Sequence, residues 1–167
     1  MLLQQLKEPL FFKKHLQGYI YRIAVLPPHF SGNKWFKLKY NRQHAKHLKH
    51  NTLLSFGGAY SNHIYALADI GKKYGFNTIG IIRGEETTPL NPILSFAKES
   101  GMRLIYINRQ LDRKKHTTEF IHALKEKLGH FYLIPEGGSN AWAIKGCTEI
   151  LAHLSSPWDY ICTPCGT

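Results

Sequence analysis

The chain has 167 residues, 43% of them hydrophobic and 20% charged, and this composition argues against a disordered segment. Its formal net charge is +11, and its three cysteines, an odd number, do not make a disulfide framework. It carries no apolar run long enough to cross a bilayer and no basic-then-apolar leader, so we expect a cytoplasmic protein with the size of one domain or two small layers.

The beginning of the chain is predicted to be extended. Residues 11–26 mix β-branched and aromatic side chains and end at Pro27-Pro28, after which a helix is expected over residues 35–48. From residue 52 onward, short apolar runs alternate with helical segments. We expect strands at 52–56, 78–82, 103–107, 131–134 and 160–162, and helices at 61–74, 89–100, 117–128 and 141–154.

This alternation of strands and helices predicts an α/β fold built from βαβ units. The expected architecture is an open parallel sheet with helices on both faces. In such sheets, ligands bind at the carboxyl ends of the strands. Three glycine-bearing loops fall at such ends, namely Gly57-Gly58, Gly137-Gly138 and Cys165-Gly166-Thr167. We therefore expect the three loops to face one pocket.

Lys34 is the first candidate for chemistry. It follows Gly32 and Asn33 and lies just before the predicted helix over 35–48. The positive end of a helix and burial both lower the pKa of a lysine, and a neutral amine can form a Schiff base with an aldehyde. On spacing alone, an ordinary surface lysine within a basic segment explains the same pattern.

The second candidate is the loop from Gly57 to His63. Glycines allow a ligand to approach the backbone, and the free N–H groups of the following helix favour an anion. Ser61 is also an ordinary helix N-cap, which is the simpler explanation for a serine at this place. The loop lacks the patterns of a P-loop, of a dinucleotide-binding turn and of a hydrolase nucleophile elbow.

A third loop, Pro135 to Asn140, repeats the order Gly-Gly then Ser-Asn at another strand end. A turn followed by an N-cap explains this loop if it is taken alone. Beside the second candidate, it predicts two loops that grip one small polar ligand.

Two other features favour simpler interpretations. Cys162 and Cys165 form a C-x-x-C pair without a second pair or a nearby histidine cluster, so we expect no metal site and no redox couple. Basic residues crowd the segment after residue 33, and a solvated helix face explains them better than a polyanion site. They are Lys34, Lys37, Lys39, Arg42, Lys46 and Lys49.

These motifs together resemble the family of 1-aminocyclopropane-1-carboxylate deaminase and D-cysteine desulfhydrase, which are pyridoxal-phosphate enzymes with the tryptophan-synthase-β type of fold. The resemblance is carried by residues 31–34 with 37–38 and 40–41, by residues 55–63, and by residues 134–140 with 146.

The resemblance implies roles for individual residues. It implies that Lys34 carries pyridoxal 5'-phosphate covalently and that Asn62 hydrogen-bonds the oxygen of the cofactor ring. It implies that Ser61, Asn62 and His63 line the site for the substrate carboxylate, and that Ser61 is a candidate nucleophile. Gly166 and Thr167 resemble the start of the family's loop for the cofactor phosphate.

The resemblance also implies a larger protein. Family members are much longer, so we expect an N-terminal portion: residues 1–40 from a large cofactor domain, 41–145 as a smaller α/β domain, and 146–167 as an incomplete return to the large domain. The implied activity is a deaminase or lyase that converts a small amino acid, such as D-cysteine or 1-aminocyclopropane-1-carboxylate, to a keto acid and ammonia. The full-length family is expected to form homodimers, and the shortened chain is expected to be inactive alone.

Two alternatives remain from the sequence. The first is a folded but non-catalytic remnant of the same family. The second is a basic nucleic-acid-binding module, for which the chain offers charge but no recognised motif.

Overall fold

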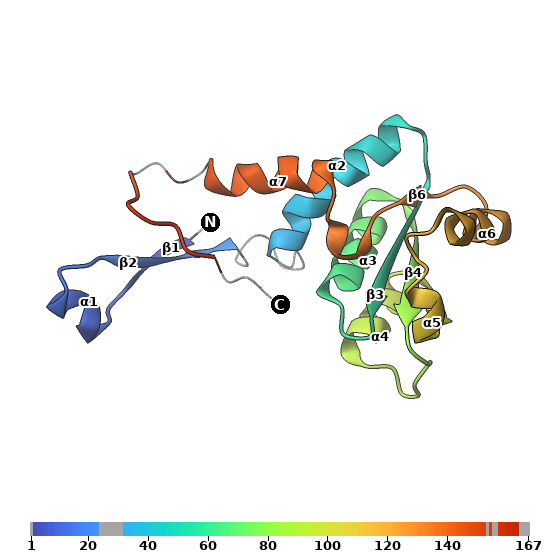
Figure 1. Ribbon diagram of the computed structural model, residues 1–167, viewed down its shortest axis with the longest axis horizontal. Helices are drawn as coiled ribbons and strands as arrows, with labels where there is room; N and C mark the ends of the chain where they lie inside the picture. Colours follow the sequence, from blue (N-terminus) through green and yellow to red (C-terminus); the bar gives the residue numbers. More distant parts are fainter. Residues whose placement is uncertain (1, 24–31, 153, 155–156, 164–167) are drawn as a thin grey trace.

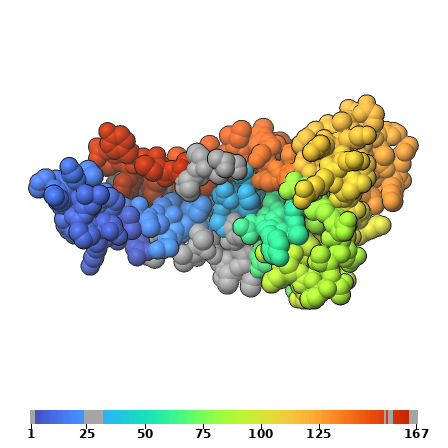
Figure 2. All heavy atoms as spheres, turned by 60° about the horizontal axis from the view of Figure 1, so that its bottom comes forward, coloured from blue at the N-terminus to red at the C-terminus, as the bar shows by residue number. Residues whose placement is uncertain are grey.

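The computed structural model describes residues 2–23, 32–152, 154 and 157–163. The described chain is elongated, with a small hairpin at one end and an α/β sheet at the other (Figure 1, Figure 2). No helix in these described ranges combines the length and the apolar character that crossing a bilayer requires.

The hairpin pairs β1 (Leu2–Leu6) with β2 (Gly18–Arg22) in antiparallel register, and a short helix α1 (Pro9–Lys13) lies between them. The prediction of a continuous extended segment over 11–26 was therefore partly wrong. Pro9 takes the first position of the helix, where its fixed φ and missing N–H cost little, and the turn then carries the chain into β2. Residues 24–26 of that prediction lie outside the described residues.

The main sheet has four parallel strands in the order β5-β4-β3-β6. They are β3 (Thr52–Gly58), β4 (Asn77–Arg83), β5 (Arg103–Ile107) and β6 (Tyr132–Leu133). Both faces of β3 and β4 are buried, as a parallel sheet between helices requires. The predicted α/β class, with an open parallel sheet between helices, is confirmed.

Two hydrophobic clusters lie on opposite faces of the sheet. Leu53 joins a cluster with α3 (Asn62–Tyr74) and α4 (Pro92–Glu99), whereas the next residue, Leu54, joins the cluster with α6 (Thr118–Leu128). Successive side chains of a strand point to opposite faces, so one run of apolar residues fills both clusters. A short helix α5 (Arg109–Asp112), which the sequence did not predict, follows β5.

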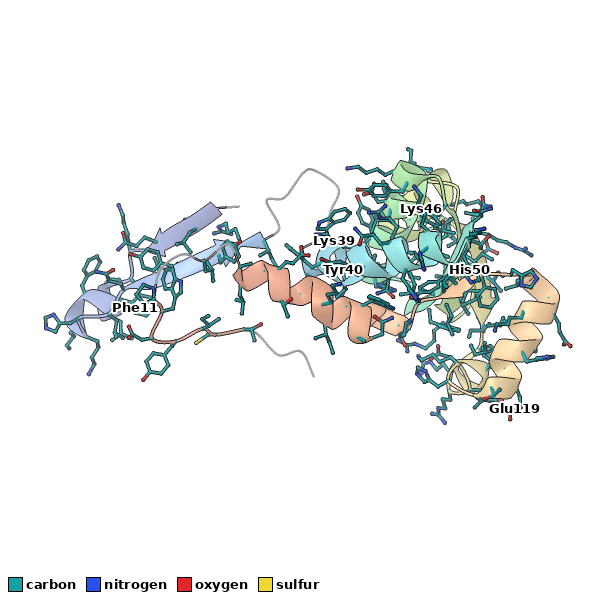
Figure 3. The ribbon with its side chains drawn as sticks, turned by 90° about the horizontal axis from the view of Figure 1, so that it is seen from above. Phe11, Lys39, Tyr40, Lys46, His50 and Glu119 are labelled. Atoms are coloured by element: carbon teal, nitrogen blue, oxygen red, sulfur yellow. The ribbon has the colours of Figure 1, made fainter. Side chains whose placement is uncertain are left out.

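Two helices link the hairpin to the sheet. The helix α2 (Asn33–His47) lies side by side with α7 (Ala141–Leu151), as Figure 1 and Figure 3 show. Glu149 of α7 binds both Lys39 and Tyr40 of α2. A 3₁₀ turn η2 (Glu136–Gly138) leads from β6 into α7.

The predicted strand at 160–162 was wrong. These residues pair with no strand among the described residues, and the side chains of Tyr160 and Ile161 are exposed. Their β-branched and aromatic character fits a strand, but no neighbouring strand in the described chain supplies hydrogen-bond partners.

Candidate active site

Lys34 occupies the first turn of α2. The helix begins directly after Gly32, whose φ of 50° and ψ of −125° suit a glycine. The Lys34 side chain is half-buried, and its pKa is lowered by that burial and by the nearby charge of Lys37, while Cys147 acts in the opposite direction. A larger share of neutral amine at Lys34 follows, and this is the form that attacks an aldehyde.

The loop between β3 and α3 is closed by Ser61. Its Oγ accepts a hydrogen bond from Ile64 N at 3.3 Å, so the expected N-cap role is present. A Cβ on Gly57 would lie 2.8 Å from Ser61 Oγ and 2.6 Å from Ile64 Cγ1, and only glycine fits there. The loop thus brings the backbone close to the positive end of α3, where a carboxylate or phosphate is favoured.

The two residues after Ser61 have different environments. Asn62 is exposed at the first position of α3. His63 is only 2% exposed, and its Nε2 lies 2.7 Å from Ser55 Oγ of β3. Burial first, and then the charges of Lys34 and Lys37, lower the pKa of His63 from 6.5 to about 3. The imidazole is therefore neutral at physiological pH.

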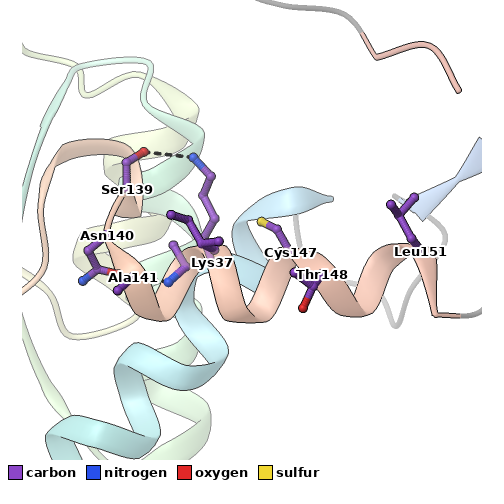
Figure 4. A pocket seen from close by; sticks show the side chains of 9 residues that line it. Lys37, Ser139, Asn140, Ala141, Cys147, Thr148 and Leu151 are labelled. Atoms are coloured by element: carbon purple, nitrogen blue, oxygen red, sulfur yellow. Dashed lines mark hydrogen bonds between the residues drawn. The ribbon is translucent and has the colours of Figure 1, made fainter.

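The loop from Pro135 to Asn140 covers His63. A Cβ on Gly138 would lie 3.3 Å from His63 Cε1 and 3.3 Å from Lys37 Cβ, and the residue has a φ of +75°. Lys37 Nζ donates to Ser139 Oγ at 3.0 Å (Figure 4). The first two glycine loops therefore approach the same group of side chains, as the sequence predicts. The third, 165–167, lies outside the described residues, as do the candidates Gly166 and Thr167.

A largely apolar cavity of about 630 Å³ lies along one side of α7, beside Lys37 and Ser139 (Figure 4). Its wall is mostly the α7 face that carries Ile144, Cys147 and Leu151. Neither Lys34 nor Ser61 lines this cavity, although Cys147 is close enough to influence the Lys34 amine. Lys34 and Ser61, two of the predicted site residues, therefore lie outside the cavity wall.

The sequence did not indicate an ion network that lies beyond the carboxyl ends of β4, β5 and β6. Lys115 binds Asp112 and Glu136, and Arg83 at the end of β4 binds Asp112 at 3.3 Å. Burial lowers the pKa of Lys115, but its hydrogen bonds to Glu136 and Asp112 outweigh burial and hold the pKa above 10.5. The network fixes the start of the η2 turn, because Glu136 is its first residue.

Ser55 was also missed as a site residue. A polar side chain within the buried run of β3, two positions before Gly57, was the available signal. Within the described ranges, no cluster of three histidine, cysteine or acidic side chains could hold a metal ion. Cys162 is exposed as a free thiol, and Cys165 of the C-x-x-C pair lies outside the described residues.

Known proteins resemble this chain over part of their length. Relatives from Pyrococcus furiosus and Thermotoga maritima, both provisionally named 1-aminocyclopropane-1-carboxylate deaminase, are 28% and 32% identical to it. The matches cover 73% and 66% of this chain but only 37% and 36% of the relatives. The chain thus spans little more than a third of these relatives. No protein-family model matches it.

Solved structures share the fold. A structure described as the ACC deaminase homologue has a TM-score of 0.76 at 22% identity, over 95% of this chain and 49% of that one. A pyridoxal 5'-phosphate-dependent aspartate racemase has a TM-score of 0.59 at 13% identity, over 91% of this chain and 46% of that one. Across the part that it shares with these proteins, the chain is similar in sequence to proteins provisionally named 1-aminocyclopropane-1-carboxylate deaminase, and it shares the fold of a structure described as a homologue of that enzyme, as the motifs predict.

Proposed function

We propose that this chain supplies the lysine-bearing part of a pyridoxal-phosphate-dependent deaminase or lyase that acts on a small amino acid. The observation that carries the proposal is the placement of Lys34. Its amine is half-buried, its pKa is lowered, and its charge acts on His63 of the Gly57–His63 loop. A lysine that faced bulk water, far from this loop, would not support the proposal.

The residues present fit the proposed cofactor. Lys34 would hold its aldehyde carbon, and the Ser61–Asn62 start of α3 would hold an oxygen of the cofactor or the carboxylate of the substrate. Pyridoxal phosphate, when bound, supplies an electron sink for charge that develops on the substrate's α-carbon. Lys34, once released, is the group able to take up the proton from that carbon.

The proposed substrates are D-cysteine or a close analogue, and 1-aminocyclopropane-1-carboxylate. The proposed products are a keto acid and ammonia, with sulfide in addition from D-cysteine. The relatives' names favour the cyclopropane substrate. The chain covers about a third of those relatives. A turnover assay on the chain alone distinguishes an active fragment from a non-catalytic remnant.

We further propose the division into domains that the sequence suggests. The four parallel strands all fall between residues 52 and 133, inside the proposed smaller domain of 41–145. Residues 1–40 and 146–167 would belong to a larger cofactor domain. We also propose a cytoplasmic location and a homodimer for the full-length form. Both depend on the resemblance, and a mass measurement in solution tests the dimer.

Nucleic-acid binding is the weaker proposal. Several basic side chains of α2 already have partners: Lys37 binds Ser139, Lys39 binds Glu149, and the Arg42 guanidinium lies 3.9 Å from the centre of the Tyr74 ring. The ion pair with Glu149 offsets the charge of Lys39, and the other two contacts hold Lys37 and Arg42 against the protein. Binding to DNA that falls steeply with added salt would favour this second function instead.

The test of the main proposal is an absorbance titration with pyridoxal phosphate. Wild-type protein is expected to develop a band near the edge of the visible range, and Lys34→Ala is expected to abolish it. Lys46→Ala is the matched control, because Lys46 is an exposed lysine near the far end of the same helix and its loss should leave the band in place. Equal uptake by wild type and Lys34→Ala would refute the assignment of Lys34.

Ser61 needs a control for its capping role. Ser61→Ala should lower the unfolding free energy by about 1 kcal/mol, and so should Thr117→Ala at the N-cap of α6. If Ser61 also contributes to the site, only Ser61→Ala should reduce sulfide and pyruvate formation from D-cysteine. This assay is made on the chain alone and with a downstream polypeptide of a relative.

A further inference from the structure

Asn41 is an unexpected residue at its place in α2. It lies in the middle of the helix and is fully buried, although asparagine is a weak helix former and an amide is costly to bury. A leucine would fill a similar volume without polar atoms. Replacing both members of a buried hydrogen-bonded pair by apolar groups is often nearly neutral for stability, so stability alone does not explain this asparagine.

The amide of Asn41 is hydrogen-bonded on both of its ends. Its Nδ2 donates to the carbonyl oxygen of Lys37 at 2.7 Å and to Asn140 Oδ1 at 3.1 Å. In the opposite direction, Asn140 Nδ2 donates to Asn41 Oδ1 at 2.7 Å. The Tyr132 hydroxyl of β6 lies 3.4 Å from the same oxygen. A buried amide with its donors and its acceptor paired holds its neighbours in one arrangement.

Neither amide of this pair can be turned over. The carbonyl of Lys37 can only accept, so Asn41 must direct Nδ2 toward it. Asn140 is the N-cap of α7 and its Oδ1 accepts from Ala143 N at 3.0 Å, which fixes the orientation of the second amide. Each orientation is set by a separate backbone partner, and the two are complementary. The pair therefore joins α2 to the start of α7 in one geometry.

Asn41 shares one face of α2 with Lys34 and Lys37. The three residues are spaced i, i+3 and i+7, and Lys34 lies about 10 Å from Asn41 along the helix axis. Lys37 Nζ donates to Ser139 Oγ at 3.0 Å (Figure 4). Two consecutive residues of the loop, Ser139 and Asn140, are thus held by the helix face that also carries Lys34.

We propose that Asn41 is a positioning residue, which fixes the loop from Pro135 to Asn140 against the helix that carries Lys34. The inference deepens the proposed function and rests on it for its significance. If the loop and Lys34 serve one ligand, their relative placement has to be fixed to within a fraction of an ångström, and a pair of interlocked amides supplies such a link.

The two helices are also held together elsewhere. Glu149, near the far end of α7, binds Lys39 and Tyr40 of α2. Those contacts attach α7 to α2 without the asparagine pair. The role left to the pair is to set the place of the loop at the near end of α7.

The loop carries two features of the site with it. Gly138 packs against His63, and Ser139 and Asn140 belong to the wall of the cavity along α7 (Figure 4). A loop that shifted on α2 would move the cover of His63 and one wall of the cavity together, while Lys34 stayed with its own helix.

A double substitution removes the link and leaves no buried polar atom behind. Asn41→Leu keeps most of the volume, and Asn140→Ser keeps an N-cap of equal rank on α7. Tyr132 retains its contact with His44 at 3.1 Å. Asn108→Ser is the matched control, because Asn108 caps α5 through Leu111 N within its own turn.

The first readout is amide hydrogen exchange in protein without cofactor. The Gly138 amide donates to the Pro135 carbonyl at 2.8 Å, so its exchange reports opening of the loop. It should exchange about tenfold faster in the double variant, which corresponds to the net loss of one or two hydrogen bonds. Amides of β4 and the urea midpoint should match those of Asn108→Ser. An unchanged Gly138 rate, or an equal increase in β4, would overturn the proposal.

A second measurement covers the case in which the double variant fails to fold. In wild-type protein, the side-chain NH₂ protons of Asn41 and Asn140 should show a mutual nuclear Overhauser effect and exchange with water more slowly than those of exposed Asn108. Asn140→Ser alone should again speed exchange at Gly138. Side-chain amides that exchange as fast as those of Asn108, or a Gly138 rate that does not respond, would contradict the inference.

The third readout connects the loop to Lys34 through a titration with pyridoxal phosphate, followed by absorbance and circular dichroism. The double variant should still form the band, with a dissociation constant raised about tenfold and most of the band's ellipticity lost, because the loop no longer holds the chromophore in one orientation. Asn108→Ser should behave as wild type, and a purely structural role would leave the ellipticity of the bound form unchanged.

The outcomes separate this inference from the proposed function. If the band forms equally well and with full ellipticity in the double variant, the function stands and the positioning role of Asn41 is wrong. If exchange at Gly138 responds as expected but no protein forms a band on Lys34, Asn41 fixes the loop and the proposed function is wrong.

Discussion

At the scale of single residues, His63 links the site to stability. Its pKa is about 3 in the folded protein and 6.5 when unperturbed, so between these values the unfolded chain binds a proton that the folded chain does not. The contribution of neutral His63 to the unfolding free energy is therefore fully present above pH 6.5 and is lost progressively as the pH is lowered toward 3. The slope for one proton is about 1.4 kcal/mol per pH unit.

We predict that His63→Asn flattens this acid loss. Urea unfolding at a series of pH values between 6.5 and 4 gives the unfolding free energy of both proteins. Wild type should lose stability more steeply than the variant in that range, because Asn does not titrate. Parallel curves for the two proteins would show that His63 is charged, or exposed to solvent, in the folded state.

At the scale of elements, the contact between α2 and α7 depends on one glycine. A Cβ on Gly146 would lie far inside van der Waals contact with the backbone carbonyl oxygen of Phe36. A backbone atom cannot rotate away as a side chain can, so the two helices would have to separate. The same helices carry Lys34 and the wall of the cavity.

We predict that Gly146→Ala destabilises the protein by about 3 kcal/mol. In a solvent-exposed helix the same change would stabilise by about 1 kcal/mol, so even the sign tests the packing. Ile144→Ala is the control on α7, because its side chain is 68% exposed and its loss should change stability by no more than about 0.5 kcal/mol. Denaturant unfolding measures both, and a stabilised Gly146→Ala would contradict the close helix contact.

The helices and strands of the sheet could be predicted because local signals agree with one another. Ser61 caps α3 at its start, and Gly75 ends it in the left-handed conformation. A serine just before a helical segment and a glycine just after it are the signals by which the sequence predicts both ends. The predicted strand at 160–162 failed because a strand needs a neighbour, which its own residues do not reveal. The link between Ser55 and His63 also depends on tertiary contact, since the Ile134 carbonyl that orients it is 79 residues away.

At the scale of the whole molecule, the hydrophobic core is confined to the sheet end. None of the residues in the two buried clusters comes from residues 2–23, whereas β3, β4 and α3 contribute heavily. The hairpin residues Leu10, Phe12 and Leu16 are all more than half exposed. A two-stranded hairpin without a buried face is marginally stable in water.

We therefore predict two levels of protection in hydrogen exchange. Amides of β1 and β2 should exchange through local opening of the hairpin and show little protection. Amides of β3 and β4 should exchange only when the whole sheet unfolds, and so should be strongly protected. Peptides from both regions are measured in the same sample and corrected for intrinsic exchange rates, so that each region serves as the control for the other. Adding a downstream polypeptide of a relative should slow exchange in the hairpin if residues 1–40 belong to a larger domain. Equal protection of hairpin and sheet in the chain alone would instead mean that both ends of the molecule unfold as one cooperative unit.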